Sequence, residues 1–270
     1  MSARRPAVIA ATGAALAVAV LASTSRAQDR AEPLGGKRHR PAESPQHFAA
    51  EVRFSPFTPD IDSDPSLTGR PFATAFGTCT GTPPTCDTSP RVLVSVELDW
   101  QALRIPHVGS LGPGLGAGYT TMSAQAQFTT LHNGSSTSGE TTSLDIYPFY
   151  AVAVLRADGL WRDFGVPLVP YAKLGFGYAL WRASNTLGTS SAGGVAGKGH
   201  TVGTELALGL GLNLNVFDQY AAKNFDDSMG VNNTYLFAEW TRAALTGLGS
   251  QTNALRVGGT SWTFGLAFEF

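Results

Sequence analysis

The chain has 270 residues, 14% of which are charged, and its formal net charge at pH 7 is −1. This balance is neither the basic footprint of a nucleic-acid-binding protein nor the acidic profile of a disordered chain. With 31 glycines, the composition leaves a globular β protein or a membrane-spanning β-barrel.

The amino terminus has the pattern of an export signal. Arg4 and Arg5 precede an apolar run from Ala7 to Ala22, and Ser25-Arg26-Ala27 has the small residues of a cleavage site. Residues 1–27 are therefore expected to be removed. The alternative is an uncleaved anchor, but the run is shorter than the roughly 20 apolar residues of a spanning helix. Residues 28–46 lack periodicity and are expected to be a flexible periplasmic lead-in.

From residue 47 onward, apolar and polar residues alternate with a period of two, which predicts β-strands. The clearest case is 200–217, where five leucines from Leu206 to Leu214 occupy every second position. A helix would need apolar residues three and four apart. The predicted strands are 47–55, 91–103, 111–127, 141–156, 167–181, 200–217, 231–242 and 258–270. The segments 56–90, 129–140, 182–198 and 243–257 are expected to be loops, and 218–230 has room for a helical turn near 220–224.

The closing segment, 258–270, gives the strongest indication of the fold. Its apolar face consists of Trp262, Phe264, Leu266, Phe268 and Phe270. In water such a strand would be an aggregation-prone edge, whereas in a barrel lipid covers the apolar face and ring closure removes the edge. We therefore predict an all-β fold, an eight-stranded antiparallel transmembrane β-barrel of the outer-membrane type over residues 47–270, with long extracellular loops. The alternative, a soluble sandwich or lipocalin-like barrel, would turn its apolar residues inward.

The opposite parity of each strand defines the predicted interior. Side chains just fill an eight-stranded barrel, so we expect a plug and not a pore. Acids outnumber bases in it, and Arg53 and Lys173 are expected to lie between carboxylates. A cation-conducting or proton-sensitive interior is the alternative to this structural network. The predicted network comprises Glu51, Arg53, Glu97, Asp99, Asp145, Lys173, Glu205, Glu239 and Glu269.

Glycines on the inward parity predict a second packing rule, in which aromatic rings cover cross-strand glycines. Symmetric pairing of the fourth and fifth strands would place Tyr147 opposite Gly177 and Phe149 opposite Gly175. Leucine at either glycine is then expected to block assembly.

Little in the sequence suggests chemistry. Cys79 and Cys86 are expected to form a disulfide, because an exported chain meets an oxidising compartment. His200 with Glu205, and His132 near loop serines, are weak candidates for hydrolysis. Asp60, Asp62 and Asp64 alternate, but they lack the spaced ligand set of a calcium loop. We predict no catalytic, cofactor-binding or metal-ligating residues.

Several segments together carry a resemblance to known proteins. They are Phe48-Ala-Ala-Glu-Val-Arg-Phe54, Pro59-Asp-Ile-Asp62, Phe76-Gly77, Glu97-Leu-Asp-Trp-Gln101, Pro167-Leu-Val-Pro-Tyr-Ala-Lys-Leu-Gly175, Gly230-Val-Asn-Asn-Thr-Tyr-Leu-Phe-Ala-Glu239 and the terminal Phe-Gly-Leu-Ala-Phe-Glu-Phe. On these segments the chain resembles a family of small outer-membrane β-barrels from myxobacteria and their relatives. The resemblance implies an outer-membrane barrel and supplies no catalytic residues. Phe270 resembles the terminal aromatic by which such barrels are recognised for insertion.

The expected function is a structural or surface-interaction role of a monomeric barrel in the Gram-negative outer membrane, carried by its extracellular loops. The expected partners are outer-membrane lipid, the barrel-assembly machinery and an unknown extracellular ligand, with no nucleic acid. A small ion or solute channel and an outer-membrane enzyme that hydrolyses lipid or peptide are the alternatives.

Overall fold

The computed structural model describes residues 46–81, 85–132, 135–192, 194–249 and 254–270. The predicted signal peptide, and the lead-in up to residue 45, lie outside the described residues. Within them, none of the helices has both the length and the hydropathy that crossing a membrane would require.

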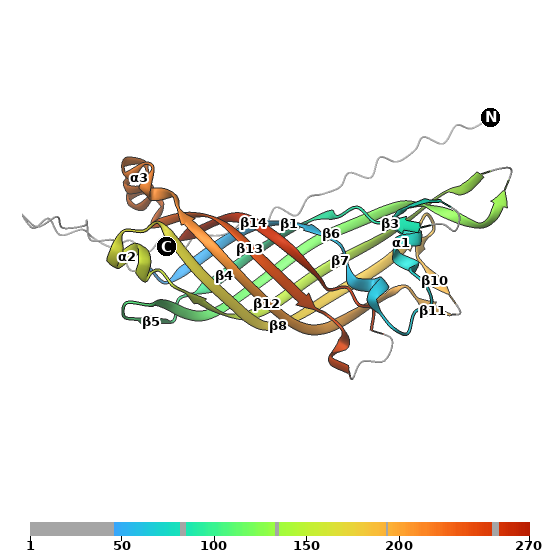
Figure 1. Cartoon of the computed structure of the whole chain (residues 1–270), viewed down its shortest axis with the longest axis horizontal. Helices are drawn as coiled ribbons and strands as arrows, with labels where there is room; N and C mark the ends of the chain where they lie inside the picture. Colours follow the sequence, from blue (N-terminus) through green and yellow to red (C-terminus); the bar gives the residue numbers. More distant parts are fainter. Residues whose placement is uncertain (1–45, 82–84, 133–134, 193, 250–253) are drawn as a thin grey trace, which may run out of the picture. The chain divides into compact units, whose positions relative to one another are not determined.

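Eight long antiparallel strands close into a ring, which confirms the predicted fold (Figure 1). Their order around the ring is β12-β13-β14-β1-β4-β6-β7-β8, and β8 pairs back onto β12. The first and last strands, β1 and β14, lie side by side, with Ala50 opposite Phe268 and Phe54 opposite Phe264. The bounds are β1 Phe48–Phe57, β4 Arg91–Trp100, β6 Gly109–His132, β7 Ser135–Arg156, β8 Leu168–Asn185, β12 Lys198–Asn213, β13 Asn233–Ala244 and β14 Gly259–Glu269.

Shorter elements join these strands at the two ends of the barrel. We call the end where β1 begins and β14 finishes the terminal end, and the opposite end the loop end. The terminal end carries β5 (Leu103–Ile105), α2 (Gly159–Phe164), η2 (Leu214–Val216) and α3 (Gln219–Met229). The loop end carries η1 (Asp60–Ser63), α1 (Pro71–Phe76), β2 (Thr78–Thr80), β3 (Thr85–Asp87), β9 (Gly188–Thr189), β10 (Ser191–Ala192), β11 (Val195–Ala196) and η3 (Gly247–Gly249).

The two faces of the wall are the reverse of those of a soluble protein. Leucine, valine and aromatic side chains are exposed on the outer face, including Leu98, Leu208 and Phe264, while charged side chains such as Glu51 and Lys173 are buried inside. This arrangement is stable only where hydrocarbon covers the outer face. The chain is therefore a transmembrane barrel of the outer membrane.

The fourth predicted strand has the opposite orientation to the one expected. Ile146, Val152 and Val154 are buried inside, whereas Tyr147 and Phe149 are exposed on the outer face. Both parities of this strand are rich in apolar residues, so alternation alone could not orient it. The predicted pairing with β8 was also wrong, because Gly177 lies opposite Tyr150 and Gly175 lies opposite Val152.

The segment 129–140 was predicted to be a loop, yet β6 extends to His132 and β7 begins at Ser135. Beyond the ladder shared with its neighbours, this pair continues as a two-stranded ribbon at the loop end (Figure 1). In the sequence of 129–140, polar residues occupy both parities, so the alternation that marks a membrane strand is missing there.

The first loop folds over the loop end of the barrel. Ile61 of η1 and Phe72 of α1 are buried in one apolar cluster with Leu144 and Ile146 of β7. The carboxylate of Asp62 accepts hydrogen bonds from the backbone N–H groups of Phe72 and Ala73, at 2.7 and 2.9 Å. These bonds satisfy donors at the start of α1 and hold its apolar face against the barrel.

Candidate functional site

The barrel interior contains a network of buried ionic side chains centred on Arg53. The guanidinium of Arg53, on β1, forms ion pairs with the carboxylates of Glu97 on β4, Glu239 on β13 and Glu51, the last at 3.2 Å. All four residues are buried. Buried charges are tolerated only when paired and hydrogen-bonded, and this geometry provides both.

Lys173, on β8, completes the same layer from the facing wall. Its Nζ lies 2.7 Å from Glu51 Oε2, 2.7 Å from Glu97 Oε1 and 3.5 Å from Glu239 Oε2. Three carboxylates therefore surround two cations. Oxygens of Glu51, Glu97 and Asp99 lie within 4.8 Å of one another, as in a metal site. However, the ammonium of Lys173 already contacts two of these carboxylates, so it supplies the charge that a metal ion would bring.

Arg156, on β7, forms a second layer nearer the terminal end, and the sequence interpretation missed it. Its guanidinium lies 3.0 Å from Glu51, 3.1 Å from Asp99 and 3.7 Å from Glu269. Glu269 also accepts a hydrogen bond from the hydroxyl of Tyr235, at 2.9 Å. Arg156 shares the parity of Ile146 and Val152, so a correct orientation of β7 would have identified it.

Asp145 does not belong to this network, contrary to the prediction. It follows the outward parity of β7, near the loop end, and the hydroxyl of Tyr119 donates a hydrogen bond to its carboxylate at 3.1 Å. The same reversed orientation of β7 that hid Arg156 explains this error.

Tyrosine rings fill the space around the ions by packing onto glycines. A Cβ atom added at Gly116 would collide with the ring of Tyr150, and one at Gly209 with the ring of Tyr171. The hydroxyl of Tyr150 donates to Glu97 at 2.9 Å, and its ring lies 5.5 Å from the Arg53 guanidinium. The expected rule of rings over glycines therefore operates here, whereas the expected pairs Tyr147–Gly177 and Phe149–Gly175 do not form.

The glycines chosen by the sequence interpretation face other neighbours. A Cβ at Gly175 would lie 2.6 Å from Val152 Cα, whereas one at Gly177 would lie 2.8 Å from Leu245 Cδ2. The backbone of a paired strand cannot move away from an added Cβ atom, whereas the end of a leucine side chain can adopt another rotamer. Of these two glycines, only Gly175 lies so close to neighbouring backbone that no side chain fits there.

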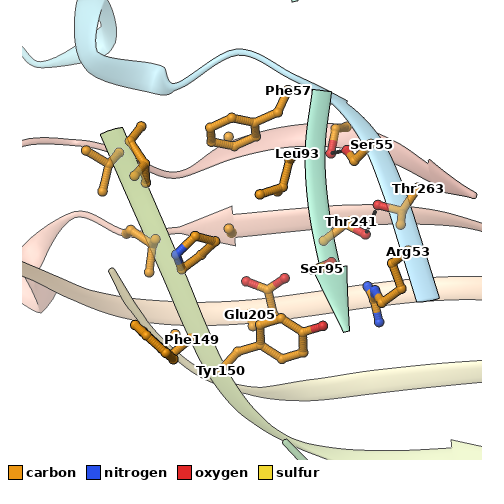
Figure 2. Close-up of a pocket in the computed structure, with 18 residues that line it drawn as sticks. Arg53, Ser55, Phe57, Leu93, Ser95, Phe149, Tyr150, Glu205, Thr241 and Thr263 are labelled. Carbon is orange, nitrogen blue, oxygen red and sulfur yellow. Dashed lines mark hydrogen bonds between the residues drawn. The ribbon is translucent and has the colours of Figure 1, made fainter. Parts of the chain in front are cut away.

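A small cavity of about 50 Å³ separates the ionic network from the apolar cluster at the loop end. Figure 2 shows the carboxylate of Glu205 beside the ring of Tyr150, with Arg53 across the space and the Thr241 and Thr263 side chains between the strands. The cavity has room for a few water molecules. Glu205 makes no ion pair among the described residues, and it faces this cavity.

The residues proposed for other chemistry are not brought together. His200 stacks on Tyr178, at 5.6 Å between ring centroids, on the outward parity of β12, whereas Glu205 points inward. The structure describes the backbone of His132 and not its side chain. Cys79 and Cys86 form the expected disulfide across the β2–β3 hairpin.

Two of the three alternating aspartates serve the first loop itself. Asp62 caps α1, and Asp64 accepts hydrogen bonds from the backbone N–H and the hydroxyl of Ser66, at 2.9 and 2.7 Å. These two bonds, with a smaller effect of Arg256 at 3.7 Å, hold the pKa of Asp64 below its usual range. Their carboxylates are thus engaged in local hydrogen bonds.

The closing strand places its five apolar residues on the outer wall. Trp262, Phe264 and Leu266 are exposed, and Phe268 and Phe270 are half-buried. The ring of Phe270 lies 6.3 Å from that of Phe48, where β14 meets β1.

The ring of strands and the buried ionic network together define an eight-stranded outer-membrane β-barrel with an occluded interior. Solved structures of that class resemble the chain. OprG from Pseudomonas aeruginosa matches at 12% identity and a TM-score of 0.43, over 83% of this chain and 96% of that one. Ail, the attachment invasion locus protein of Yersinia pestis, solved with the heparin analogue sucrose octasulfate, matches at 11% identity and a TM-score of 0.39, over 83% and 97%.

The N-terminal β-barrel domain of OprF from P. aeruginosa matches at 10% identity and a TM-score of 0.37, over 83% of this chain and 98% of that one. No protein-family model and no curated protein sequence matches the chain. All three TM-scores are below 0.5, so these likenesses carry no argument about activity or ligands. The strand order itself establishes the barrel.

Proposed function

We propose that this protein is a non-enzymatic, monomeric outer-membrane barrel that acts through its loop end, by contact with molecules outside the cell. One observation carries the proposal: side chains occupy the interior except for one small cavity among the described residues. The apolar cluster around Ile146 fills the loop end, and beyond a cavity of about 50 Å³ the ions around Arg53 and Arg156 and the aromatic cluster around Tyr235 fill the barrel. A filled barrel offers no passage, so the work must be done on its surface.

The loop end has structures suited to holding a fixed surface. The disulfide closes the β2–β3 hairpin, and Arg70 donates a hydrogen bond to the Cys86 carbonyl at 3.1 Å. The backbone N–H of Asp60 donates to the Gly258 carbonyl at 2.7 Å, which ties the first loop to the last. A surface held in this way loses less entropy when it binds a partner.

The remaining parts of the proposal follow from the sequence. Residues 1–27 direct export and are removed, residues 28–46 lie in the periplasm, and the apolar residues ending at Phe270 are recognised by the barrel-assembly machinery. The loop end then faces outward, as the longer loops of such barrels do. We also propose that the chain is a relative of the small myxobacterial-type barrels that it resembles.

Two measurements test this function. A thiol reagent that does not cross membranes is applied to intact cells after reduction, and it should label Cys79 and Cys86 if the loop end is outside.

Proteoliposomes carrying the intact chain are then compared, on an array of glycans and matrix proteins, with a variant in which residues 78–87 are replaced by a short Gly-Ser link. Loss of a binding signal with the barrel intact supports the proposal, and labelling only in lysed cells contradicts it.

One observation favours a second function, a cation path. Five buried carboxylates share three buried cations in the network, and a sixth, Glu205, faces the cavity, which has room for water. Single-channel recording in planar bilayers decides between the two functions. We expect no steady conductance from the wild-type barrel, whereas a cation-selective current abolished by Glu205→Leu would establish the channel.

A further inference from the structure

An apolar groove lies outside the barrel, at its terminal end, between α3 and the wall. Its volume is about 220 Å³. The floor is the Thr234–Phe268 pair of β13 and β14, and Ala221, Ala222 and Phe225 of α3 line it from the helix. The groove is smaller than the pockets that enclose whole drug-sized ligands. It therefore suits one flexible chain better than a bulky molecule.

The floor of the groove continues the lipid-facing surface of the barrel. Thr234 and Phe268 form the last cross-strand pair of an outward stripe, and the adjoining pair on the same face is Leu236 with Leu266, both exposed. Lipid chains that cover this stripe meet the groove where the stripe ends. No polar barrier separates the two along these strands.

Two of the three polar residues that line the groove use their side chains in hydrogen bonds within the protein. Asp218 accepts hydrogen bonds from the N–H groups of Tyr220 and Ala221, at 3.0 and 2.9 Å. Asn215 donates to the Asn232 carbonyl at 2.7 Å and accepts from the Thr234 N–H at 3.3 Å. Apart from Thr234, the remaining lining is apolar, so it offers a ligand mainly dispersion and the burial of apolar surface.

The helix itself has the character of an interfacial element. Tyr220 and Met229 are 78% and 65% exposed, Phe217 just before the helix is 74% exposed, and Lys223 and the acids Asp226 and Asp227 lie between them in the sequence. Large apolar side chains exposed beside charges are typical of a helix that lies at the boundary between headgroups and acyl chains. Figure 1 shows α3 at the end of the barrel where the chain finishes.

From these observations we propose that the groove between α3 and the β13–β14 wall binds one acyl chain of a phospholipid from the adjacent leaflet. The chain enters from the outward stripe and lies over Phe268, with Ala221 and Ala222 leaving it room. The bound lipid fixes α3 at the membrane surface. This site is separate from the loop end and does not depend on the function proposed for that end.

The test uses the full-length barrel in nanodiscs made with a phosphatidylcholine that carries a photoreactive diazirine in one acyl chain. After irradiation, labelled peptides are quantified by mass spectrometry. In the wild type we expect label on the α3 peptide at least as strong as on the exposed stripe of β12. In Ala222→Trp, which fills the groove, the α3 label should fall at least fivefold while the β12 label stays unchanged.

Lys223→Trp is the matched control, because it adds the same side chain to α3 at an exposed position that does not line the groove. It should keep the wild-type α3 label. Equal loss in both variants, or wild-type α3 label far below that of β12, overturns the proposal. Ala221→Trp replaces Ala222→Trp if the latter does not fold, and the wild-type measurement stands in either case.

Discussion

Replacing Lys173 by methionine tests whether the ionic network holds the barrel together. The Lys173 ammonium contacts three buried carboxylates, two of them at 2.7 Å. Methionine keeps most of the volume, so the cavity contribution to the loss is small. What remains is the cost of breaking a buried ion pair, about 3–5 kcal/mol of the free energy of unfolding.

The assay is urea unfolding of the barrel in detergent micelles, followed by tryptophan fluorescence and by gel migration with and without heating. Arg256→Met is the matched control, because the pair of Arg256 with Asp64 is 3.7 Å long, lies outside the barrel and is partly exposed. Such a pair is worth roughly 0–1 kcal/mol.

A second variant separates lost charge balance from lost packing. In Lys173→Met with Glu97→Gln, the excess of buried carboxylates is reduced by one while Arg53 keeps Glu51 and Glu239, so the double variant should recover about 0.5–3 kcal/mol relative to Lys173→Met alone. A loss no larger than that of Arg256→Met would refute the reasoning. So would a double variant that is less stable than Lys173→Met alone.

Three further predictions concern the wall and the first loop. Gly175→Ala should prevent folding, because its Cβ meets backbone, whereas Gly177→Ala should fold, and heat-modifiable gel migration distinguishes them. Replacing both Cys79 and Cys86 by serine removes the closure of a short loop, worth roughly 2–3 kcal/mol, so hydrogen exchange should quicken in 78–87 and stay constant in the barrel strands. The pKa of Asp64 is lowered in the folded protein, so its contribution is complete above the unfolded value of about 4 and is lost as the pH falls through the lower folded value. Protection of residues 60–66 from exchange should therefore fall on acidification from about pH 5 to about pH 2, and Asp64→Asn should remove that dependence.

Alternation predicted most of the barrel because the membrane imposes it on every strand that crosses. The leucines of β12 and the aromatic residues of β14 needed no tertiary information, since lipid covers one parity and only the other can hold charge. The prediction failed where that constraint ends. In β7 the apolar cluster at the loop end places Ile146 inside, and Asp145 lies outward near that end, so charge no longer marks the interior.

The contacts within the interior could not be derived from the sequence. Parity shows that Arg53 and Lys173 face inward, but their shared carboxylates come from β1, β4 and β13, and the relative stagger of these strands decides which side chains meet. The groove beside α3 could not be predicted from the sequence either. It depends on how an eleven-residue helix returns to the wall, and no pattern in 218–230 encodes that path.

The ionic network also depends on the register of the strands, because its ion pairs form only when the strands are correctly aligned. Its members sit on strands from β1 to β14, so no local segment of the chain can form it before the ring has closed. A slip of one residue in β8 would turn Lys173 toward hydrocarbon, at roughly 2–4 kcal/mol near the bilayer centre. A slip of two would keep it inside but move it away from its carboxylates. The complete set of buried ion pairs can therefore form in only one register of the strands.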